Sequence, residues 1–340
     1  MDLQILTETA TALVGKGRGI LAIDESTPTC NKRFEARGID ATEDNRRAYR
    51  ELLVAGEGLS EYVGGAILFD ETIRQTAADG QALPDFMMSR GIVPGIKVDT
   101  GAKPLAGHAA ELVTEGLDGL RDRLAEYYGL GARFAKWRAV ITIANGTPTS
   151  ACIEANAHAL ARYAALCQEA QIVPIVEPEV LMDGTHSIDS CYEITAKTLT
   201  SVFAQLENQG VALEGTILKP SMVISGAGDT DRAGVEQVAA QTLRCLRDNV
   251  PAGVSGVAFL SGGQSDSEAT QHLNLMNQFD RNAPWPLTFS FGRALQREAL
   301  ETWRGNPEKV TEATAALLER ARLNSLAARG QYRPESAQTA

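Results

Sequence analysis

Long apolar segments are missing from this sequence. No uninterrupted apolar run approaches the roughly 18 residues of a membrane-spanning helix, and the start, MDLQILTETATALVGKG, lacks the basic and apolar regions of a signal peptide. Cations are also few, since 32 Lys and Arg stand against 43 Asp and Glu, a net charge of -11. These shortages argue against membrane and nucleic-acid partners and make the position of each cation informative.

Cysteine and histidine are scarce and scattered. The five cysteines form an odd set without a CxxC pair, so we expect structural thiols in a reducing, cytoplasmic compartment. The four histidines, His108, His158, His186 and His272, show no metal-ligand spacing and lie outside the strand-end motifs described below. The sequence therefore predicts neither a metal site nor a cofactor, and each histidine is expected at the surface or in a loop.

Short apolar runs bounded by glycine recur along the chain and are typical of buried parallel strands. Eight are present: 19–24 (GILAID), 64–70 (GGAILFD), 91–99 (GIVPGIKVD), 133–141 (RFAKWRAVI), 172–180 (IVPIVEPEV), 213–220 (LEGTILKP), 256–263 (GVAFLSGG) and 287–294 (LTFSFGRA). Helix-like stretches separate most of them, the clearest at 147–169, behind a Thr147-Pro148 start. Strands that alternate with helices indicate parallel βα units.

Eight such units close into a (β/α)8 (TIM) barrel, an α/β fold whose strands are covered on both sides. An open doubly wound sheet is the alternative. No linker or low-complexity block interrupts the series, so we predict one domain over residues 1–340. It should carry an N-terminal helix, a further helical segment at roughly 306–329 and a polar, mobile tail at about 330–340.

Charged residues stand at the carboxyl ends of the predicted strands, where barrel enzymes place their active sites. Residues two apart on a strand point to the same side, so three pairs should face the mouth of the barrel: Lys97 with Asp99, Lys136 with Arg138, and Glu177 with Glu179. Asp24 and Lys219 end two further runs. Burying such charges under the helices would be costly, which favours the mouth, although salt bridges that merely close the barrel are the alternative.

Two regions of the mouth could each bind a phosphate. SGGQS at 261–265 follows the seventh apolar run and precedes a helix, and Gly292-Arg293 lies near the end of the eighth run. The loops after the seventh and eighth strands are the usual phosphate position of this fold. An ordinary glycine turn is the alternative. A second group consists of Ser26, Thr29, Lys32 and Arg33 after the first run, together with Lys97 on the third run. Two phosphate sites would suit a substrate phosphorylated at both ends.

A lysine at such a mouth can attack a carbonyl carbon and form a Schiff base, provided that its amine is uncharged part of the time. Lys219 is the candidate, because burial and a neighbouring cation such as Lys136 would favour the uncharged amine. Glu177 or Glu179 could then transfer protons, and Asp24 could remove a hydroxyl proton to start carbon-carbon cleavage. The alternatives are a phosphosugar isomerase that uses glutamate alone and a catalytically silent barrel that binds sugar phosphate or a protein partner.

The chain resembles the class I, Schiff-base-forming fructose-1,6-bisphosphate aldolases through motifs that occur in family order from about residue 15 to 332. They include LAIDEST, NRRAYRELL, GGAILFDET, GIKVD, FAKWR, IVPIVEPEV, EGTILKP, FLSGGQS and TFSFGRALQ. The resemblance implies reversible cleavage of fructose 1,6-bisphosphate to dihydroxyacetone phosphate and glyceraldehyde 3-phosphate, in glycolysis and gluconeogenesis. It also implies a metal-independent enzyme that is usually a homotetramer.

The resemblance further implies roles for single residues. Lys219 would form the Schiff base, Glu177 would be the main acid and base, and Asp24 would help to remove the proton of the C4 hydroxyl. Lys136 would lie beside the imine, while Arg138 and Glu179 would shape the pocket. One phosphate would be held by Ser261, Gly262, Gly263, Ser290, Gly292 and Arg293. The other end of the sugar would be surrounded by Ser26, Thr29, Arg33 and Lys97.

Overall fold

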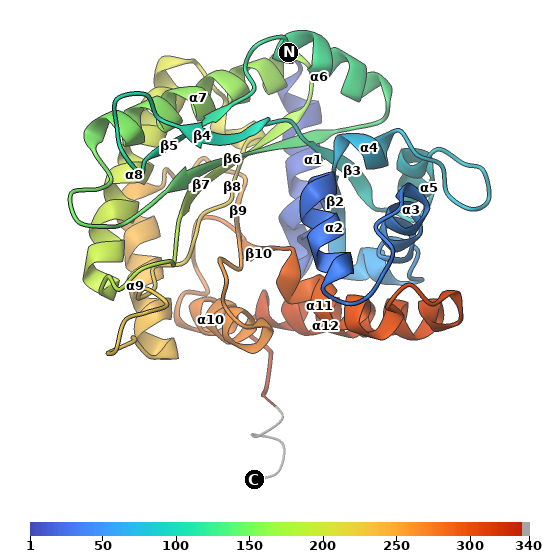
Figure 1. Ribbon diagram of the computed structural model, residues 1–340. Helices are drawn as coiled ribbons and strands as arrows, with labels where there is room; N and C mark the ends of the chain where they lie inside the picture. The colour runs from blue at the N-terminus through green and yellow to red at the C-terminus, as the bar shows by residue number, and fades with distance from the viewer. Residues whose placement is uncertain (335–340) are drawn as a thin grey trace.

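Eight parallel strands close into a barrel within residues 1–334, the part of the chain that the computed structural model describes (Figure 1). Their order around the barrel is β1-β10-β9-β8-β7-β6-β3-β2. Their bounds are β1 (Gly19–Ala22), β2 (Val63–Leu68), β3 (Val93–Lys97), β6 (Phe134–Ile141), β7 (Val173–Val180), β8 (Ile217–Leu218), β9 (Gly256–Phe259) and β10 (Leu287–Phe291). The predicted (β/α)8 barrel is confirmed, and the open sheet is excluded because β1 pairs with both β2 and β10.

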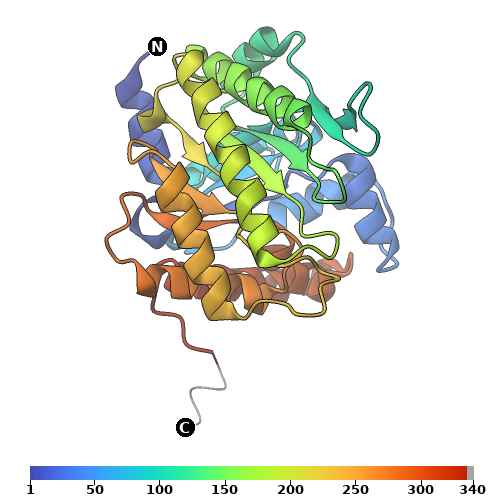
Figure 2. The same cartoon turned by 90° about the vertical axis from the view of Figure 1, so that its left-hand side faces the viewer.

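Helices cover the outside of the barrel, and α7, α8 and α9 lie next to one another there (Figure 2). The helices in chain order are α1 (Leu3–Val14), α2 (Thr27–Glu35), α3 (Glu43–Leu52), α4 (Asp70–Ile73), α5 (Leu83–Ser89), α6 (Leu120–Gly129), α7 (Ser150–Glu169), α8 (Ile188–Asn208), α9 (Val235–Asn249), α10 (Asp266–Phe279), α11 (Arg293–Trp303) and α12 (Val310–Ala327). The predicted helix at 147–169 is α7, but it begins later because Thr149 is its N-cap, accepting a hydrogen bond from the Cys152 N–H.

Helix α1 closes the amino end of the barrel. Its Leu6 and Leu13 belong to one buried cluster with inward-facing strand residues such as Ile217. Inside the barrel, the ring of Phe134 fills the space beside Gly95, where a Cβ atom would lie only 2.3 Å from the ring. The lower barrel is therefore solid apolar core, and any open space has to lie at the carboxyl ends of the strands.

The sixth barrel strand is much shorter than the predicted run 213–220. Residues Leu213–Gly215 form a 3-10 turn that packs against α1, and only Ile217–Leu218 is strand. Pairing with β7 continues for one more residue, because the Lys219 N–H donates to the carbonyl oxygen of Val176 at 2.8 Å. This bond fixes the backbone of Lys219 at the carboxyl end of the strand.

A β-hairpin beside the barrel was not predicted. It consists of β4 (Gly101–Pro104) and β5 (Leu112–Glu115), and it follows β3 directly. The carbonyl oxygen of Leu112 accepts a hydrogen bond from the Asn156 side chain of α7 at 2.8 Å, which ties the hairpin to the barrel. The segment KPLAGHAAEL has the composition of a loop and lacks the alternation of a strand, so its pairing depends on these tertiary contacts.

The C-terminal part of the described chain is helical up to Ala327. The predicted helical segment at 306–329 is a 3-10 turn, Pro307–Lys309, followed by α12. Beyond it the Tyr332 N–H donates to Asn274 at 2.9 Å, while residues 335–340 of the predicted tail lie outside the described residues.

All five cysteines lie in the described part, where each is buried and free. Among the described helices, none is long and apolar enough to cross a membrane.

Candidate active site

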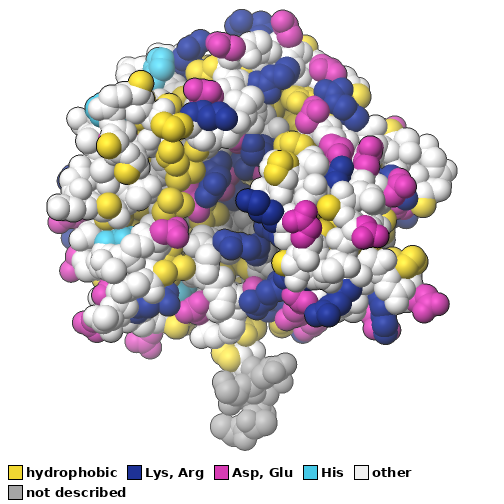
Figure 3. All heavy atoms as spheres, viewed as in Figure 1, with side chains coloured by type: hydrophobic (Ala, Val, Ile, Leu, Met, Phe, Trp, Pro, Cys, Tyr) yellow, Lys and Arg dark blue, Asp and Glu magenta, His cyan; other side chains and the backbone are white. Residues whose placement is uncertain are grey.

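A cavity of about 880 Å³ opens at the carboxyl ends of the strands. Lys and Arg side chains gather in this hollow at the centre of the face seen in Figure 3. Of the predicted residues, the following line it: Asp24, Ser26, Thr29, Arg33, Lys97, Lys136, Arg138, Glu177, Glu179, Lys219, Ser261, Gly262, Ser290, Gly292 and Arg293. Gly263 and Lys32 are both exposed, and neither lines the cavity. An acidic protein thus concentrates cations at one place.

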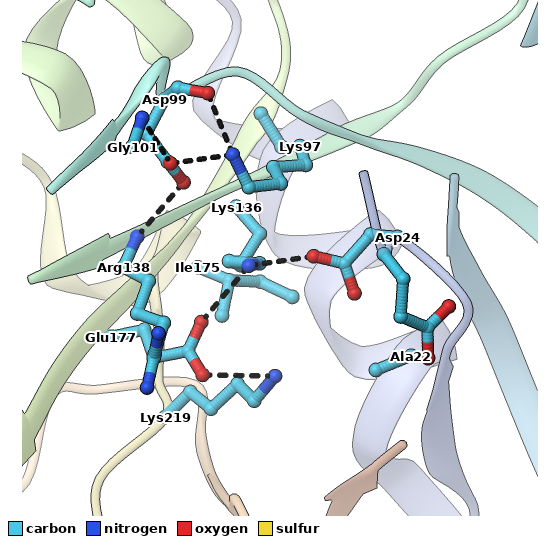
Figure 4. A network of polar contacts seen from close by, with 12 residues as sticks. Ala22, Asp24, Lys97, Asp99, Gly101, Lys136, Arg138, Ile175, Glu177 and Lys219 are labelled. Carbon is cyan, nitrogen blue, oxygen red and sulfur yellow. Dashed lines mark hydrogen bonds and ion pairs between the residues drawn. The ribbon is translucent and has the colours of Figure 1, made fainter. Parts of the chain in front are cut away.

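Four side chains form a continuous charged chain in the cavity: three come from the adjacent strands β6 and β7 and the end of β8, and Asp24 reaches them from the end of β1 across the barrel (Figure 4). The Lys136 Nζ lies 2.6 Å from Asp24 Oδ2 and 3.4 Å from Glu177 Oε2, and the Lys219 Nζ lies 3.2 Å from Glu177 Oε1. Lys136 and Lys219 are each only 4% exposed. Two carboxylates therefore compensate two ammonium groups that are almost fully buried.

The two lysines differ in how strongly each is paired. Burial alone would lower the pKa of Lys136, but the nearby Asp24 and Glu177 carboxylates raise it above its ordinary value. Burial alone would raise the pKa of Asp24, but Lys136 and Lys219 lower it to about 2. Lys136 is thus a permanent cation between two carboxylates, whereas Lys219 contacts only one side chain of opposite charge, Glu177, among the described residues.

A second charged chain runs along the rim of the cavity, and Asp99 is at its centre. The Asp99 carboxylate accepts hydrogen bonds from the Lys97 ammonium at 2.5 Å, the Gly101 N–H at 3.1 Å and the Arg138 N–H at 3.3 Å. The Arg138 guanidinium in turn pairs with Glu179. The sequence placed Asp99 beside Lys97 at the mouth of the barrel, because the two residues are two apart on one strand. It did not predict that Asp99 joins Lys97 and Arg138.

Glu25 also lines the cavity, and sequence reasoning assigned it no role. Its carboxylate pairs with both Arg33 and Arg50 and accepts a hydrogen bond from the Gln296 side chain at 2.9 Å. Burial would raise the pKa of Glu25, but Arg50 and Arg33 hold it below its usual value. Glu25 therefore fixes Arg33 at the mouth. Arg50 lies on α3, where nothing in the local sequence distinguishes a buried arginine from a solvent-exposed one.

Between β9 and α10 lies a glycine turn that could receive an anion. Gly262 and Gly263 have φ of +55° and +91°, a left-handed backbone that residues with side chains rarely adopt. In the described residues, the buried Ser290 Oγ has no hydrogen-bond partner and Arg293 forms no ion pair. A hydroxyl, a guanidinium and a flexible backbone thus meet without partners, an arrangement that an anion such as phosphate would satisfy.

The histidines lie away from this charged cavity. His158 is exposed and His108 is half-buried, whereas His186 is buried in the loop after β7. The prediction of a surface or loop position was wrong for His272, which is 3% exposed inside α10, because it packs beneath the 261–265 turn as a neutral, hydrogen-bonded ring. No group of three or more His, Cys, Asp or Glu in residues 1–334 is arranged to hold a metal ion.

Comparison with known proteins identifies fructose-bisphosphate aldolases among the relatives of this chain. The family model described as fructose-bisphosphate aldolase class-I matches residues 5–340. A probable fructose-bisphosphate aldolase class 1 of Xanthomonas campestris is 59% identical over 98% of this chain and 100% of its own length. The chloroplastic fructose-bisphosphate aldolase 2 of Arabidopsis thaliana is 52% identical over 97% of this chain and 82% of its own.

A solved structure agrees with these matches. It is the fructose-bisphosphate aldolase from Plasmodium falciparum, in complex with TRAP and a small-molecule inhibitor, at 47% identity and a TM-score of 0.96. The likeness covers 98% of this chain and 96% of that one. With a match over nearly the whole chain in sequence and in fold, this protein belongs to the class-I fructose-bisphosphate aldolase family.

Proposed function

We propose that this chain cleaves fructose 1,6-bisphosphate reversibly to dihydroxyacetone phosphate and glyceraldehyde 3-phosphate through a Schiff base on Lys219. The observation that carries the proposal is the buried chain Asp24, Lys136, Glu177 and Lys219, set in a cavity with cations and hydroxyls at its rim. Sugar bisphosphates carry negative charge at both ends, so this cavity matches their charge. Membranes and nucleic acids are not among the proposed partners.

Lys219 is the better nucleophile of the two buried lysines. Lys136 is held between Asp24 and Glu177, so its positive charge is stabilised twice. Lys219 can give one proton to Glu177 Oε1, 3.2 Å away, and the amine that results can attack the C2 carbonyl carbon of the open-chain ketose. The C2 alkoxide formed in this attack takes a proton from the new ammonium nitrogen and becomes a hydroxyl. Glu177 then returns its proton to this hydroxyl, which leaves as water as the protonated C2–N double bond forms.

Carbon-carbon cleavage needs a base at the C4 hydroxyl and an electron sink at C2. The protonated imine on Lys219 supplies the sink: the C4 hydroxyl loses its proton, the C3–C4 bond breaks and its electron pair forms an enamine. With a pKa of about 2, Asp24 is charged at neutral pH but is a weak base, so it takes this proton in step with electron withdrawal by the imine. Lys136 keeps a positive charge beside the reacting atoms.

The remaining cavity residues are assigned to substrate binding. One phosphate would bind to the glycine turn and the unpaired groups beside it: Ser261, Gly262, Gly263, Ser290, Gly292 and Arg293. The other end of the sugar would contact Ser26, Thr29, Arg33 and Lys97. Arg138 and Glu179, paired with each other, would shape the wall between them.

Trapping with borohydride tests the covalent step. The protein is incubated with dihydroxyacetone phosphate, the imine is reduced, and the modified peptide is located by mass spectrometry. We expect one adduct, on Lys219, and aldol cleavage that persists when EDTA is added. Turnover of a phosphosugar without any adduct would indicate an isomerase, and sugar-phosphate binding without turnover or adduct would indicate a silent barrel.

Replacing Arg293 by alanine should weaken bisphosphate turnover without unfolding the protein. The guanidinium forms no ion pair among the described residues, so its loss leaves no buried charge unpaired. Loss of one charged hydrogen-bond partner of a phosphate should lower kcat/KM for fructose 1,6-bisphosphate roughly 10- to 100-fold. Arg244→Ala is the control, since Arg244 on α9 is an exposed arginine whose partner Asp248 is also exposed and lies outside the cavity. Equal kcat/KM in both variants would contradict the phosphate role.

We infer further that the chain works in the cytoplasm as a homo-oligomer, a tetramer by family expectation. Free, buried thiols suit a reducing compartment. Leu3 and Ile5 on α1 are 39% and 42% exposed, and such apolar side chains are common at contacts between subunits. Light scattering on the purified protein measures the assembly directly.

A further inference from the structure

The glycine turn after β9 is supported from below by a buried side chain that the proposed reaction does not use. His272 of α10 places its Nδ1 2.6 Å from the Gln264 Oε1. Both side chains are buried, and neither lines the cavity. Gln264 itself belongs to the turn, directly after Gly263. The hydrogen bond therefore joins the phosphate-facing segment to a helix on the outside of the barrel.

The direction of this hydrogen bond follows from the other end of the amide. The Gln264 Nε2 faces the Met222 Sδ at 3.6 Å, and a thioether sulfur can only accept. The Oε1 is then turned to the imidazole, so the ring nitrogen Nδ1 must carry the proton and donate. Burial lowers the pKa of His272 to about 4; Glu268 on its own helix opposes this, and Arg232 from the β8–α9 segment adds to it. At neutral pH the ring is neutral, with its one N–H on Nδ1.

The turn has few other restraints. Its backbone closes through the Gln264 N–H, which donates to the Ser261 carbonyl oxygen at 2.9 Å. Gly262 and Gly263 have no side chains to anchor, and their backbone is intrinsically the most flexible of any residue. At the far end Ser265 caps α10 together with Glu268. Between the strand and this cap, the Gln264 side chain is the anchor of the turn.

Gln264 also connects the turn to the segment that carries the nucleophile. Met222, which contacts the amide, lies three residues after Lys219. The backbone joins the same two segments again, because the Leu260 N–H donates to the Pro220 carbonyl oxygen at 3.1 Å. The turn is thus joined to the Lys219 segment through the Gln264 amide as well as through the backbone, and the amide also contacts His272.

We propose that His272 is a positioning residue: by donating a hydrogen bond to Gln264, it holds the 261–265 turn in the conformation that receives a phosphate group. This inference rests on the proposed function, because it assigns a cause to the shape of one phosphate site. It does not place His272 in contact with substrate. The consequence is specific, since loss of the donor should loosen phosphate binding and leave the chemistry at Lys219 intact.

Two substitutions at one position separate this role from simple packing. His272→Leu keeps an apolar side chain of similar size without a donor, whereas His272→Asn puts an amide N–H where the ring Nδ1–H was. For the leucine variant we expect the KM for fructose 1,6-bisphosphate and the inhibition constant of inorganic phosphate to rise about tenfold, with kcat within about threefold. The asparagine variant should restore both constants to within about threefold of the original values.

A substrate without phosphate supplies the internal control. Borohydride trapping of dihydroxyacetone on Lys219 should proceed at the same rate in all three proteins, because the turn has nothing to bind in that compound. Should His272→Leu fail to fold, Gln264→Met carries the test, since it removes the acceptor and keeps the histidine. In the double variant the two effects should not add, because both substitutions break one contact.

The results that would overturn the positioning role of His272 differ from those that would overturn the proposed function. Unchanged KM and phosphate inhibition in folded His272→Leu or Gln264→Met overturns the positioning role, as does an equal loss in the leucine and asparagine variants. If the unsubstituted protein forms no adduct and cleaves no bisphosphate, the proposed function fails. Binding of inorganic phosphate, measured by titration calorimetry in the same variants, still decides the role of His272 in that case.

Discussion

Replacing Lys219 by methionine should abolish aldol cleavage, with a loss in kcat on the order of 10⁴-fold or more, as is typical when a covalent nucleophile is removed. Methionine matches the length of the lysine stem and fits a site that is 4% exposed. Glu177 keeps the ammonium of Lys136 at 3.4 Å, so the substitution does not leave a carboxylate buried alone, and we expect the variant to fold.

The measurement combines turnover, trapping and binding. Lys219→Met should yield no borohydride adduct with dihydroxyacetone phosphate, yet it should bind fructose 1,6-bisphosphate with a Kd within about tenfold, because the phosphate contacts remain. Lys103→Met on the exposed β4 strand is the matched control and should behave as the unsubstituted protein. An adduct that moves to Lys136 with turnover intact would transfer the nucleophile role to that residue.

The sequence predicts the barrel because its strands are locally encoded. Each of the eight apolar runs overlaps a barrel strand, since a strand covered on both sides must be apolar at nearly every position. The run 213–220 is longer than the strand it contains, because Leu213–Gly215 forms a turn that packs against α1 instead of extending β8. That contact joins segments about 200 residues apart in the chain, so a window of local sequence cannot contain it.

The residues of the site also fall into two groups: those that local spacing predicts and those whose position depends on tertiary packing. Same-side spacing on a strand and the position of a residue at a strand end are local properties, and they led to Lys136, Glu177 and Lys219. Partners contributed by distant helices are not local. Arg50, which pairs with Glu25, and His272, which supports the glycine turn, lie on helices where burial is decided by tertiary packing. Residues that support a site without lining it are thus the ones that sequence patterns predict least well.

Replacing Asp24 by asparagine should produce the second large effect. Loss of general-base assistance lowers kcat roughly 10²- to 10⁴-fold. Asparagine is uncharged, so the substitution also removes the nearest counter-charge of Lys136, the carboxylate 2.6 Å from its ammonium group. The free energy of unfolding at neutral pH should therefore fall by about 3 kcal/mol. Imine formation at Lys219 does not require Asp24, so the borohydride adduct should remain. Asp70→Asn removes a more exposed carboxylate, paired with Arg74 at the rim, and is the control.

The pH dependence of stability distinguishes this pair from a merely structural carboxylate. Because the folded-state pKa of Asp24 is about 2, against 3.8 as a reference, its contribution is complete above about pH 4 and is lost as the pH falls toward 2. The shift corresponds to about 2 kcal/mol. Urea unfolding from pH 6 downward should therefore show the stability difference between the original protein and Asp24→Asn shrinking as the pH drops below 4. A difference that stays constant over that range would mean that Asp24 is not held ionised by Lys136, and the proposed charge chain would have to be redrawn without it.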